Sequence, residues 1–152
     1  MSPTTPRAAL VAVVLSLVFA GSAAAERYVA LGDSYSSGTG TRTYFDSTCQ
    51  KSVYSYPYLL SQQRANTQLV FAACSGAKTG DVLNSQVSQL NASTGIVTIT
   101  IGGNDAGFTS VVTECAKPEW ASVCDTRVNS ARVARAKTRG AASVVVCRST
   151  TP

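Results

Sequence analysis

The sequence predicts an α/β fold in which helices cover both faces of a parallel sheet. Short apolar segments rich in β-forming residues recur along the chain, and each is followed by a loop of small residues and then by a helical pattern. This alternation of strand, loop and helix is typical of parallel sheets with crossover helices. In such sheets, functional sites form beyond the carboxyl ends of the strands.

The elements are expected in the following order. Strands are predicted at residues 27–32, 68–73 and 96–101. Between them, Pro57 suits the first turn of a helix at residues 57–65. A second helix, at residues 81–90, carries an apolar stripe with Gln and Ser opposite. A further helix at residues 128–139, ended by Gly140, precedes a fourth strand at residues 142–147.

The first 25 residues have the three parts of a secretory signal peptide. Residues 1–7 carry one positive charge, residues 8–20 are predominantly apolar, and residues 21–25 end in an Ala-x-Ala pattern. The apolar run is too short to span a bilayer, and a retained N-terminal anchor is the alternative. We therefore expect a secreted protein without a stable membrane anchor, whose mature domain is residues 26–152.

The basic net charge comes from one end of the chain. The sequence holds 13 Lys and Arg against 8 Asp and Glu, but six of the basic residues follow Asp125, where no acidic residue occurs. Residues 26–126 hold 6 basic and 8 acidic residues, a net charge of 6 − 8 = −2. A nucleic-acid binder should show a basic face with interleaved aromatic residues, whereas all six tyrosines lie between Tyr28 and Tyr58. We expect no nucleic-acid partner.

Five cysteines in an exported chain favour disulfides. Metal binding is disfavoured because the sequence has no CxxC motif and no histidine. Five choices of the odd cysteine and three pairings for each choice leave fifteen patterns open. We expect neither a metal nor an organic cofactor.

Three candidate site residues follow the three predicted strands. Ser34 lies one residue beyond the first strand, where a strand-to-helix turn exposes a hydroxyl and offers N–H groups to an oxyanion, although a helix cap is the commoner role there. Gly76 would add a backbone N–H, and Asn104, after two glycines, a carboxamide donor, although both also suit ordinary turns. Because they follow corresponding strand ends, the three together predict one site.

Three segments that contain these residues resemble the first three blocks of the SGNH (GDSL) hydrolases. They are YVALGDSYSSGTGT, AACSGAKT and VTITIGGNDAGF, and they are most similar to the secreted actinobacterial lipase and esterase branch. The resemblance covers about residues 27–125. It implies a three-layer α/β/α sandwich with a parallel sheet, and a serine hydrolase that acts on carboxylic ester bonds.

The resemblance also implies the roles of the site residues. Ser34 would be the nucleophile that forms an acyl-enzyme, and the Ser34 N–H, the Gly76 N–H and the Asn104 side chain would form the oxyanion hole. Asp33 would fix the turn. The substrate would be a lipid, a short-chain ester or an acylated sugar, and we expect a monomer. The implied disulfides are Cys49–Cys74 and Cys115–Cys124, which leaves Cys147 as the odd thiol.

The last block of the family, Asp-x-x-His, has no counterpart, because the sequence contains no histidine. We therefore expect a partial domain, truncated at the C-terminus, whose activity is lost or very low. Asp105 and Glu114 are the nearest carboxylates to the third block, but an ordinary carboxylate is a poor base for a serine. The alternatives are a non-catalytic module that binds an acyl chain or a sugar ester, and a non-functional truncated fragment.

Overall fold

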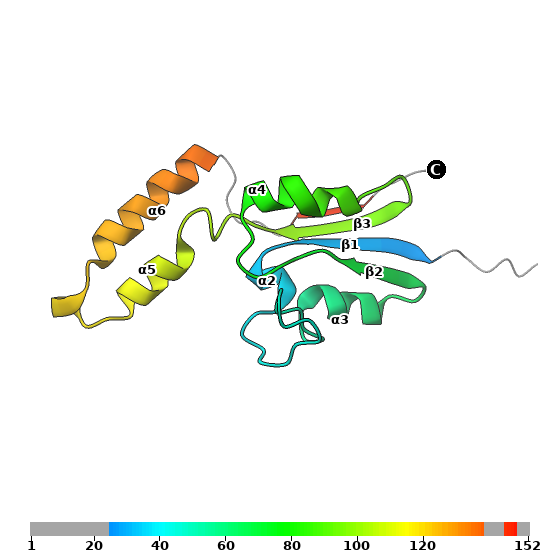
Figure 1. Cartoon of the computed structure of the whole chain (residues 1–152), viewed down its shortest axis with the longest axis horizontal. Coiled ribbons are helices and arrows are strands. Elements are labelled where there is room, and N and C mark those ends of the chain that lie inside the picture. Colours follow the sequence, from blue (N-terminus) through cyan, green and yellow to red (C-terminus); the bar gives the residue numbers. More distant parts are fainter. Residues whose placement is uncertain (1–24, 139–144, 149–152) are drawn as a thin grey trace, which may run out of the picture.

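The structure, a computed structural model, describes residues 25–138 and 145–148. All but the last residue of the expected signal peptide lie outside these residues, as does Gly140. The described strands are β1 (Glu26–Gly32), β2 (Thr67–Phe71), β3 (Thr94–Thr100) and β4 (Val145–Arg148). They form one sheet in the order β2-β1-β3-β4, and β1 is parallel to both of its neighbours (Figure 1). The first three strands agree with the prediction to within two residues.

The central strand β1 is buried from Tyr28 to Gly32 and supplies apolar side chains to both faces of the sheet. Tyr28 and Ala30 pack with Ile96 on the face covered by helix α3 (Tyr56–Gln63). Val29 and Leu31 pack with Val82 on the opposite face. That face is covered by α4 (Thr79–Asp81), by the π-helical turn η2 (Val82–Gln86) and by the 3₁₀ turn η3 (Val87–Gln89). The expected helix–sheet–helix layering is therefore confirmed (Figure 1).

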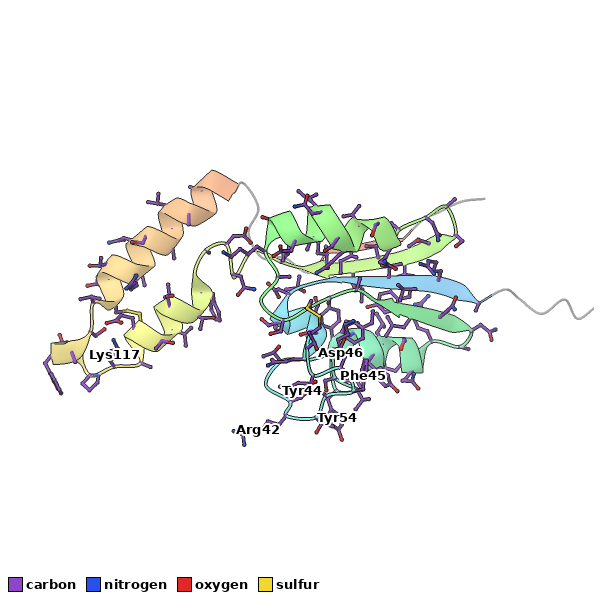
Figure 2. All side chains as sticks on the ribbon, viewed as in Figure 1. Arg42, Tyr44, Phe45, Asp46, Tyr54 and Lys117 are labelled. Atoms are coloured by element: carbon purple, nitrogen blue, oxygen red, sulfur yellow. A yellow bond between two sulfur atoms is a disulfide. The ribbon has the colours of Figure 1, made fainter. Side chains whose placement is uncertain are left out.

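The connection between the short helix α2 (Ser34–Ser37) and α3 is a long loop that is anchored at several points (Figure 2). The Cys49–Cys74 disulfide joins it to the loop after β2, and Asp46 forms an ion pair with Lys51 at 3.2 Å. Phe45 packs against Phe71 of β2, with ring centroids 5.9 Å apart. This loop is thereby fixed against the edge of the sheet that carries β2.

A helical hairpin follows β3 and projects from the sheet (Figure 1). It consists of α5 (Phe108–Cys115), the 3₁₀ turn η4 (Glu119–Ala121) and α6 (Cys124–Thr138), and the Cys115–Cys124 disulfide closes it. Both disulfides are those that the family resemblance implies. The sequence did not predict α5, and α6 begins four residues before the expected helix. Among the described residues, no helix is long and apolar enough to cross a membrane.

The fourth strand differs from the parallel arrangement of the other three. β4 pairs with β3 in the antiparallel direction, with Val145 opposite Ile99 and Arg148 opposite Ile96. A parallel strand would need a crossover that returns the chain to the amino end of β3. Here α5 and α6 pack on each other, so the chain enters β4 beside the carboxyl end of β3. Residues 142–144 of the expected strand lie outside the described residues.

Candidate functional site

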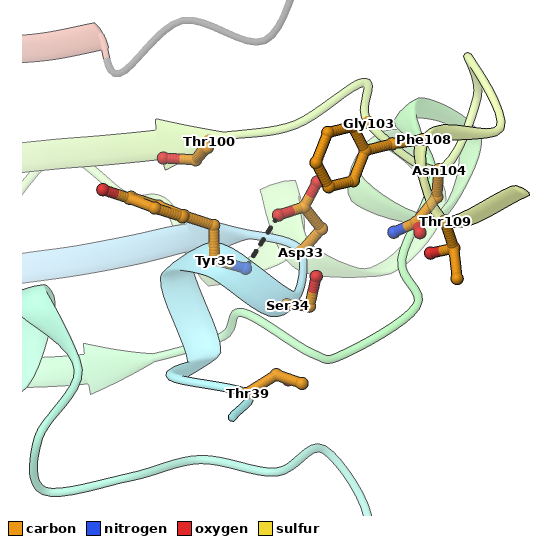
Figure 3. A pocket seen from close by; sticks show the side chains of 9 residues that line it. All are labelled: Asp33, Ser34, Tyr35, Thr39, Thr100, Gly103, Asn104, Phe108 and Thr109. Atoms are coloured by element: carbon orange, nitrogen blue, oxygen red, sulfur yellow. Dashed lines mark hydrogen bonds between the residues drawn. The ribbon is translucent and has the colours of Figure 1, made fainter. Parts of the chain in front are cut away.

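A pocket of about 300 Å³ lies at the carboxyl ends of β1 and β3 (Figure 3). Two of the three predicted site residues, Ser34 and Asn104, line it. The third, Gly76, lines a neighbouring pocket of about 480 Å³ together with Ser75 and Gln86. The remaining lining residues of the first pocket come from α2 and its flanking residues, from the end of β3 and the loop that follows it, and from α5: Asp33, Tyr35, Thr39, Thr100, Gly103, Phe108 and Thr109.

Ser34 is the first residue of α2 and is half-buried in this pocket. Asp33 caps the helix, because its Oδ1 accepts a hydrogen bond from the Tyr35 N–H at 3.1 Å (Figure 3). The Asp33 N–H donates to the Thr100 carbonyl of β3 at 3.0 Å. The turn that carries Ser34 is therefore tied both to its own helix and to the neighbouring strand.

Asp33 is 5 % exposed as a residue, and burial raises the pKa of its carboxyl group above the usual value. The N–H donated by Tyr35 opposes this shift, and the nearby Asp105 carboxylate adds to it. The Asp33 side chain thus caps the turn that carries Ser34 and also lines the pocket.

The loops after β2 and β3 are bound to each other by polar side chains. Asn104 Nδ2 donates to the Ala77 carbonyl at 2.8 Å, and the Asp105 carboxylate accepts from Thr79 Oγ1 at 2.6 Å and from Thr79 N at 3.0 Å. A carboxamide nitrogen carries two hydrogens, so the bond to Ala77 fixes the amide of Asn104 and leaves one donor. Asn104 is therefore oriented by the loop that carries Gly76.

Gly76 adopts φ +84, a conformation that favours glycine, and no atom lies within 4 Å of the position that a Cβ would take. Glycine is needed here for its backbone conformation and not for close packing. The adjacent Ser75 Oγ accepts a hydrogen bond from Thr39 Oγ1 at 2.9 Å, which joins this loop to the one that follows Ser34. All three predicted site loops are therefore connected by hydrogen bonds.

Among the described residues, none forms a hydrogen bond with the Ser34 hydroxyl. The Asp105 carboxylate accepts hydrogen bonds from the N–H and the hydroxyl of Thr79. Glu114 lies in the α5–α6 hairpin, where it accepts from Lys117 Nζ at 2.7 Å and from the Val123 N–H at 3.0 Å. The Lys117 hydrogen bond lowers the Glu114 pKa further below neutrality. Neither carboxylate forms a hydrogen bond with Ser34.

No group of three or more His, Cys, Asp or Glu side chains within the described part of the chain is arranged to hold a metal ion.

Comparisons of the sequence with known proteins all point to one family. The sequence model of the GDSL-like Lipase/Acylhydrolase family matches residues 30–152. Lipase 1 of Streptomyces coelicolor is 48% identical over 111 residues, which are 72% of this chain and 41% of that protein. A lipase of Streptomyces rimosus is 50% identical over 107 residues, 69% of this chain and 40% of that protein. The chain thus spans about two fifths of the length of these relatives.

Two solved structures of Streptomyces enzymes are similar to this chain in both fold and sequence. The extracellular lipase from Streptomyces rimosus superposes with a TM-score of 0.67 at 47% sequence identity, over 75% of this chain and 49% of that one. Phospholipase A1 from Streptomyces albidoflavus NA297 superposes with a TM-score of 0.64 at 42% identity, over 78% of this chain and 56% of that one.

Proposed function

Because the chain belongs to the GDSL-like lipase/acylhydrolase family, we propose that it carries the nucleophile and oxyanion hole of a serine hydrolase that acts on carboxylic ester bonds. Ser34 is the nucleophile. The observation that carries this proposal is that Ser34, on a capped helical turn, shares one pocket with the tethered amide of Asn104. A helix N-terminus and an oriented amide are the donors that a developing oxyanion requires.

In the proposed reaction, Ser34 Oγ attacks the ester carbonyl carbon and the carbonyl oxygen becomes an oxyanion. The Ser34 N–H, the Gly76 N–H and the remaining N–H of Asn104 donate to it. The C–O bond to the alcohol then breaks, the alcohol leaves with a proton, and water hydrolyses the acyl-enzyme. The assignment of the Gly76 N–H to the oxyanion hole has less support than that of Asn104, because Gly76 lines a different pocket from Ser34.

The proton of Ser34 limits the rate of this reaction. The 152 residues contain no histidine, and Asp105 and Glu114 are engaged elsewhere, so the proton passes to solvent. Loss of the base of a catalytic triad lowers turnover by about 10⁴- to 10⁶-fold and leaves roughly 10³-fold catalysis over water. We therefore propose slow acylation of Ser34 by this chain.

The pocket supports an acyl chain as the group bound beside Ser34. Tyr35 and Phe108 line it and are 68 % and 64 % exposed, so both present apolar surface to a ligand (Figure 3). A lipid or short-chain ester fits this lining better than an acylated sugar does. The phospholipase A1 name of one structural neighbour supports a lipid ester.

Secretion is part of the same proposal. Residues 1–25 have the composition of a signal peptide, with residues 26–152 as the mature domain. The structural neighbour from Streptomyces rimosus is described as extracellular. A monomer is the proposed state.

Labelling with an alkyl fluorophosphonate tests the nucleophile. Ser34 Oγ forms a bond to phosphorus, the P–F bond breaks, fluoride leaves, and the serine proton passes to water. We expect a single adduct at Ser34 by mass spectrometry and slow release of p-nitrophenol from p-nitrophenyl butyrate. Both should be absent in Ser34→Ala and retained in Ser110→Ala, which removes an exposed serine of α5.

A folded chain whose adduct and hydrolysis are unchanged in Ser34→Ala would contradict the proposal. Saturable binding of a fatty acid, unaffected by Ser34→Ala and without any adduct, would instead identify a non-catalytic binding module.

A further inference from the structure

The last residue of β1, Gly32, is two positions before Ser34. It is paired with Thr100 of β3 but lies beyond the end of the β1–β2 ladder. The Ala30 carbonyl accepts hydrogen bonds from the Ala72 and Ala73 N–H groups, at 2.9 Å each, on the β2 side. In a parallel strand, backbone groups of alternate residues point to the same neighbour, so the N–H and C=O of Gly32 also point to that side. The β1–β2 register ends at Ala30 and Phe71. Gly32 therefore has no residue of β2 opposite it.

The side chain of Gln86 takes the place of that missing strand residue. The Gly32 N–H donates to Gln86 Oε1 at 2.7 Å, and Gln86 Nε2 donates to the Gly32 carbonyl at 2.9 Å. The Cys74 N–H donates to the same carbonyl at 3.1 Å. A carboxamide presents a donor and an acceptor in one plane, as a peptide group does. Gln86 is 5 % exposed, and its pairing with Gly32 is shielded from water.

We infer that Gln86 is a positioning residue for the nucleophile: its carboxamide fixes Gly32 on the β2 side and thereby holds Ser34 at the rim of the pocket. This inference rests on the proposed function of Ser34. The opposite side of the turn is fixed by the bond from the Asp33 N–H to the Thr100 carbonyl. The backbone before Ser34 is therefore held on the β2 side by Gln86 and on the β3 side by Thr100.

The local structure around Gln86 favours this role over simple attachment of the helix to the sheet. Val82 is the buried apolar residue of the same turn and already packs on the β1 side chains Val29 and Leu31. The turn Val82–Gln86 is π-helical, a wide turn that is frequent at functional sites. The same turn thus holds Val82 in the core while Gln86 pairs with Gly32.

Two variants of Gln86 separate positioning from packing, each with a matched control at Gln89. Gln86→Met keeps a side chain of similar length but removes both hydrogen bonds. Gln86→Glu keeps an acceptor for the Gly32 N–H but places a carboxylate oxygen against the Gly32 carbonyl. Gln89 is exposed on η3 three residues later, so Gln89→Met and Gln89→Glu make the same chemical changes away from Gly32.

The readout is the saturation kinetics of Ser34 labelling by the alkyl fluorophosphonate, measured on the full chain at a temperature where circular dichroism shows each variant folded. A misplaced nucleophile lowers the maximal labelling rate kinact by about 10- to 100-fold, with little change in the half-saturating concentration. The Gln89 variants should stay within about twofold of the unaltered chain. If Gln86→Met does not fold, Gln86→Glu carries the comparison.

Amide hydrogen exchange followed by NMR gives a second readout that does not depend on chemistry at Ser34. The Gly32 amide should exchange about tenfold faster in Gln86→Met than in the unaltered chain, while Val29 in the middle of β1 should not change. An unchanged kinact in Gln86→Met would overturn the positioning role alone. Failure of the unaltered chain to label at Ser34 would overturn the proposed function, and the positioning role with it.

Discussion

Replacement of Gly32 by alanine tests how strictly the backbone must be held before the nucleophile. Gly32 adopts φ +128, and a Cβ at this position would overlap the Thr100 carbonyl oxygen and lie 2.5 Å from Ser36 Oγ. The backbone conformation costs an alanine about 1–3 kcal/mol. Relief of the overlap costs about another 1–3 kcal/mol. The sum is a large part of the ~5–15 kcal/mol that stabilises a domain.

Two other glycines separate these contributions. Gly40 has φ +96 but no atom within 4 Å of its Cβ position, so Gly40→Ala carries only the conformational cost. Gly80 has neither a positive φ nor a neighbour within 4 Å, and it lies in α4. Since alanine is favoured over glycine in a helix by about 0.5–1 kcal/mol, Gly80→Ala should be neutral or stabilising.

The assay is urea unfolding followed by circular dichroism, with the free energy of unfolding extrapolated to water. We expect Gly32→Ala to lose about 1–3 kcal/mol more than Gly40→Ala, because only Gly32 has the overlap. Labelling of Ser34 should fall in Gly32→Ala and stay unchanged in Gly80→Ala. Equal losses of stability in Gly32→Ala and Gly40→Ala would refute the claim that close approach of β1 and β3 requires glycine at position 32.

Two further predictions follow from the cap of α2 and from the hairpin. Burial raises the pKa of Asp33, so the folded chain is progressively destabilised as pH rises from the unfolded pKa through the folded pKa. Asp33→Asn keeps an acceptor for the Tyr35 N–H but carries no charge, so its free energy of unfolding does not fall as this carboxyl group ionises. The stability of Asp33→Asn minus that of the unaltered chain should therefore be larger at about pH 7 than at about pH 3. A difference in urea stability that does not vary with pH would contradict this. Removal of the Cys115–Cys124 disulfide, by Cys115→Ala with Cys124→Ala, opens a link between residues nine apart in sequence. On the chain-entropy model this costs about 2.6 kcal/mol, seen as faster amide exchange in α5 and α6; equally accelerated exchange in β1 would show that the hairpin is not a separate unit.

The sheet and the positions of the site loops could be predicted from local sequence. Residues 96–101 read IVTITI, and such β-branched runs ended by glycine define a buried strand and its end without knowledge of the rest of the chain. Because parallel strands end at the same edge, the residues that follow β1 and β3 had to meet. Ser34 and Asn104 do line one pocket.

The features that sequence did not predict depend on distant contacts. Gln86 lies among the Gln and Ser residues opposite the apolar stripe of the second predicted helix, a pattern typical of an exposed face. It is buried because its carboxamide pairs with the N–H and C=O of Gly32, 54 residues away, at a point beyond the last residue of β2. Helix α5 has apolar residues at helical spacing, at positions 108, 111, 112 and 115, but none of its residues is buried, because it packs on α6 in a hairpin that projects from the sheet. The direction of β4 depends in turn on where that hairpin lies.

The proposed nucleophile and oxyanion donors are assembled by contacts within residues 26–105. Gln86 pairs with Gly32, Thr39 with Ser75 and Asn104 with Ala77, and each contact joins segments attached to different strands. Each is a hydrogen bond with directional demands, so together they restrict the loops more narrowly than apolar packing of the same extent would. The α5–α6 hairpin adds Phe108 and Thr109 to the wall of the pocket but takes no part in these three contacts. The hairpin residues Phe108 and Thr109 therefore contribute to binding of an acyl chain but not to positioning of the nucleophile. Opening the hairpin disulfide should weaken binding of the fluorophosphonate while kinact at Ser34 is retained.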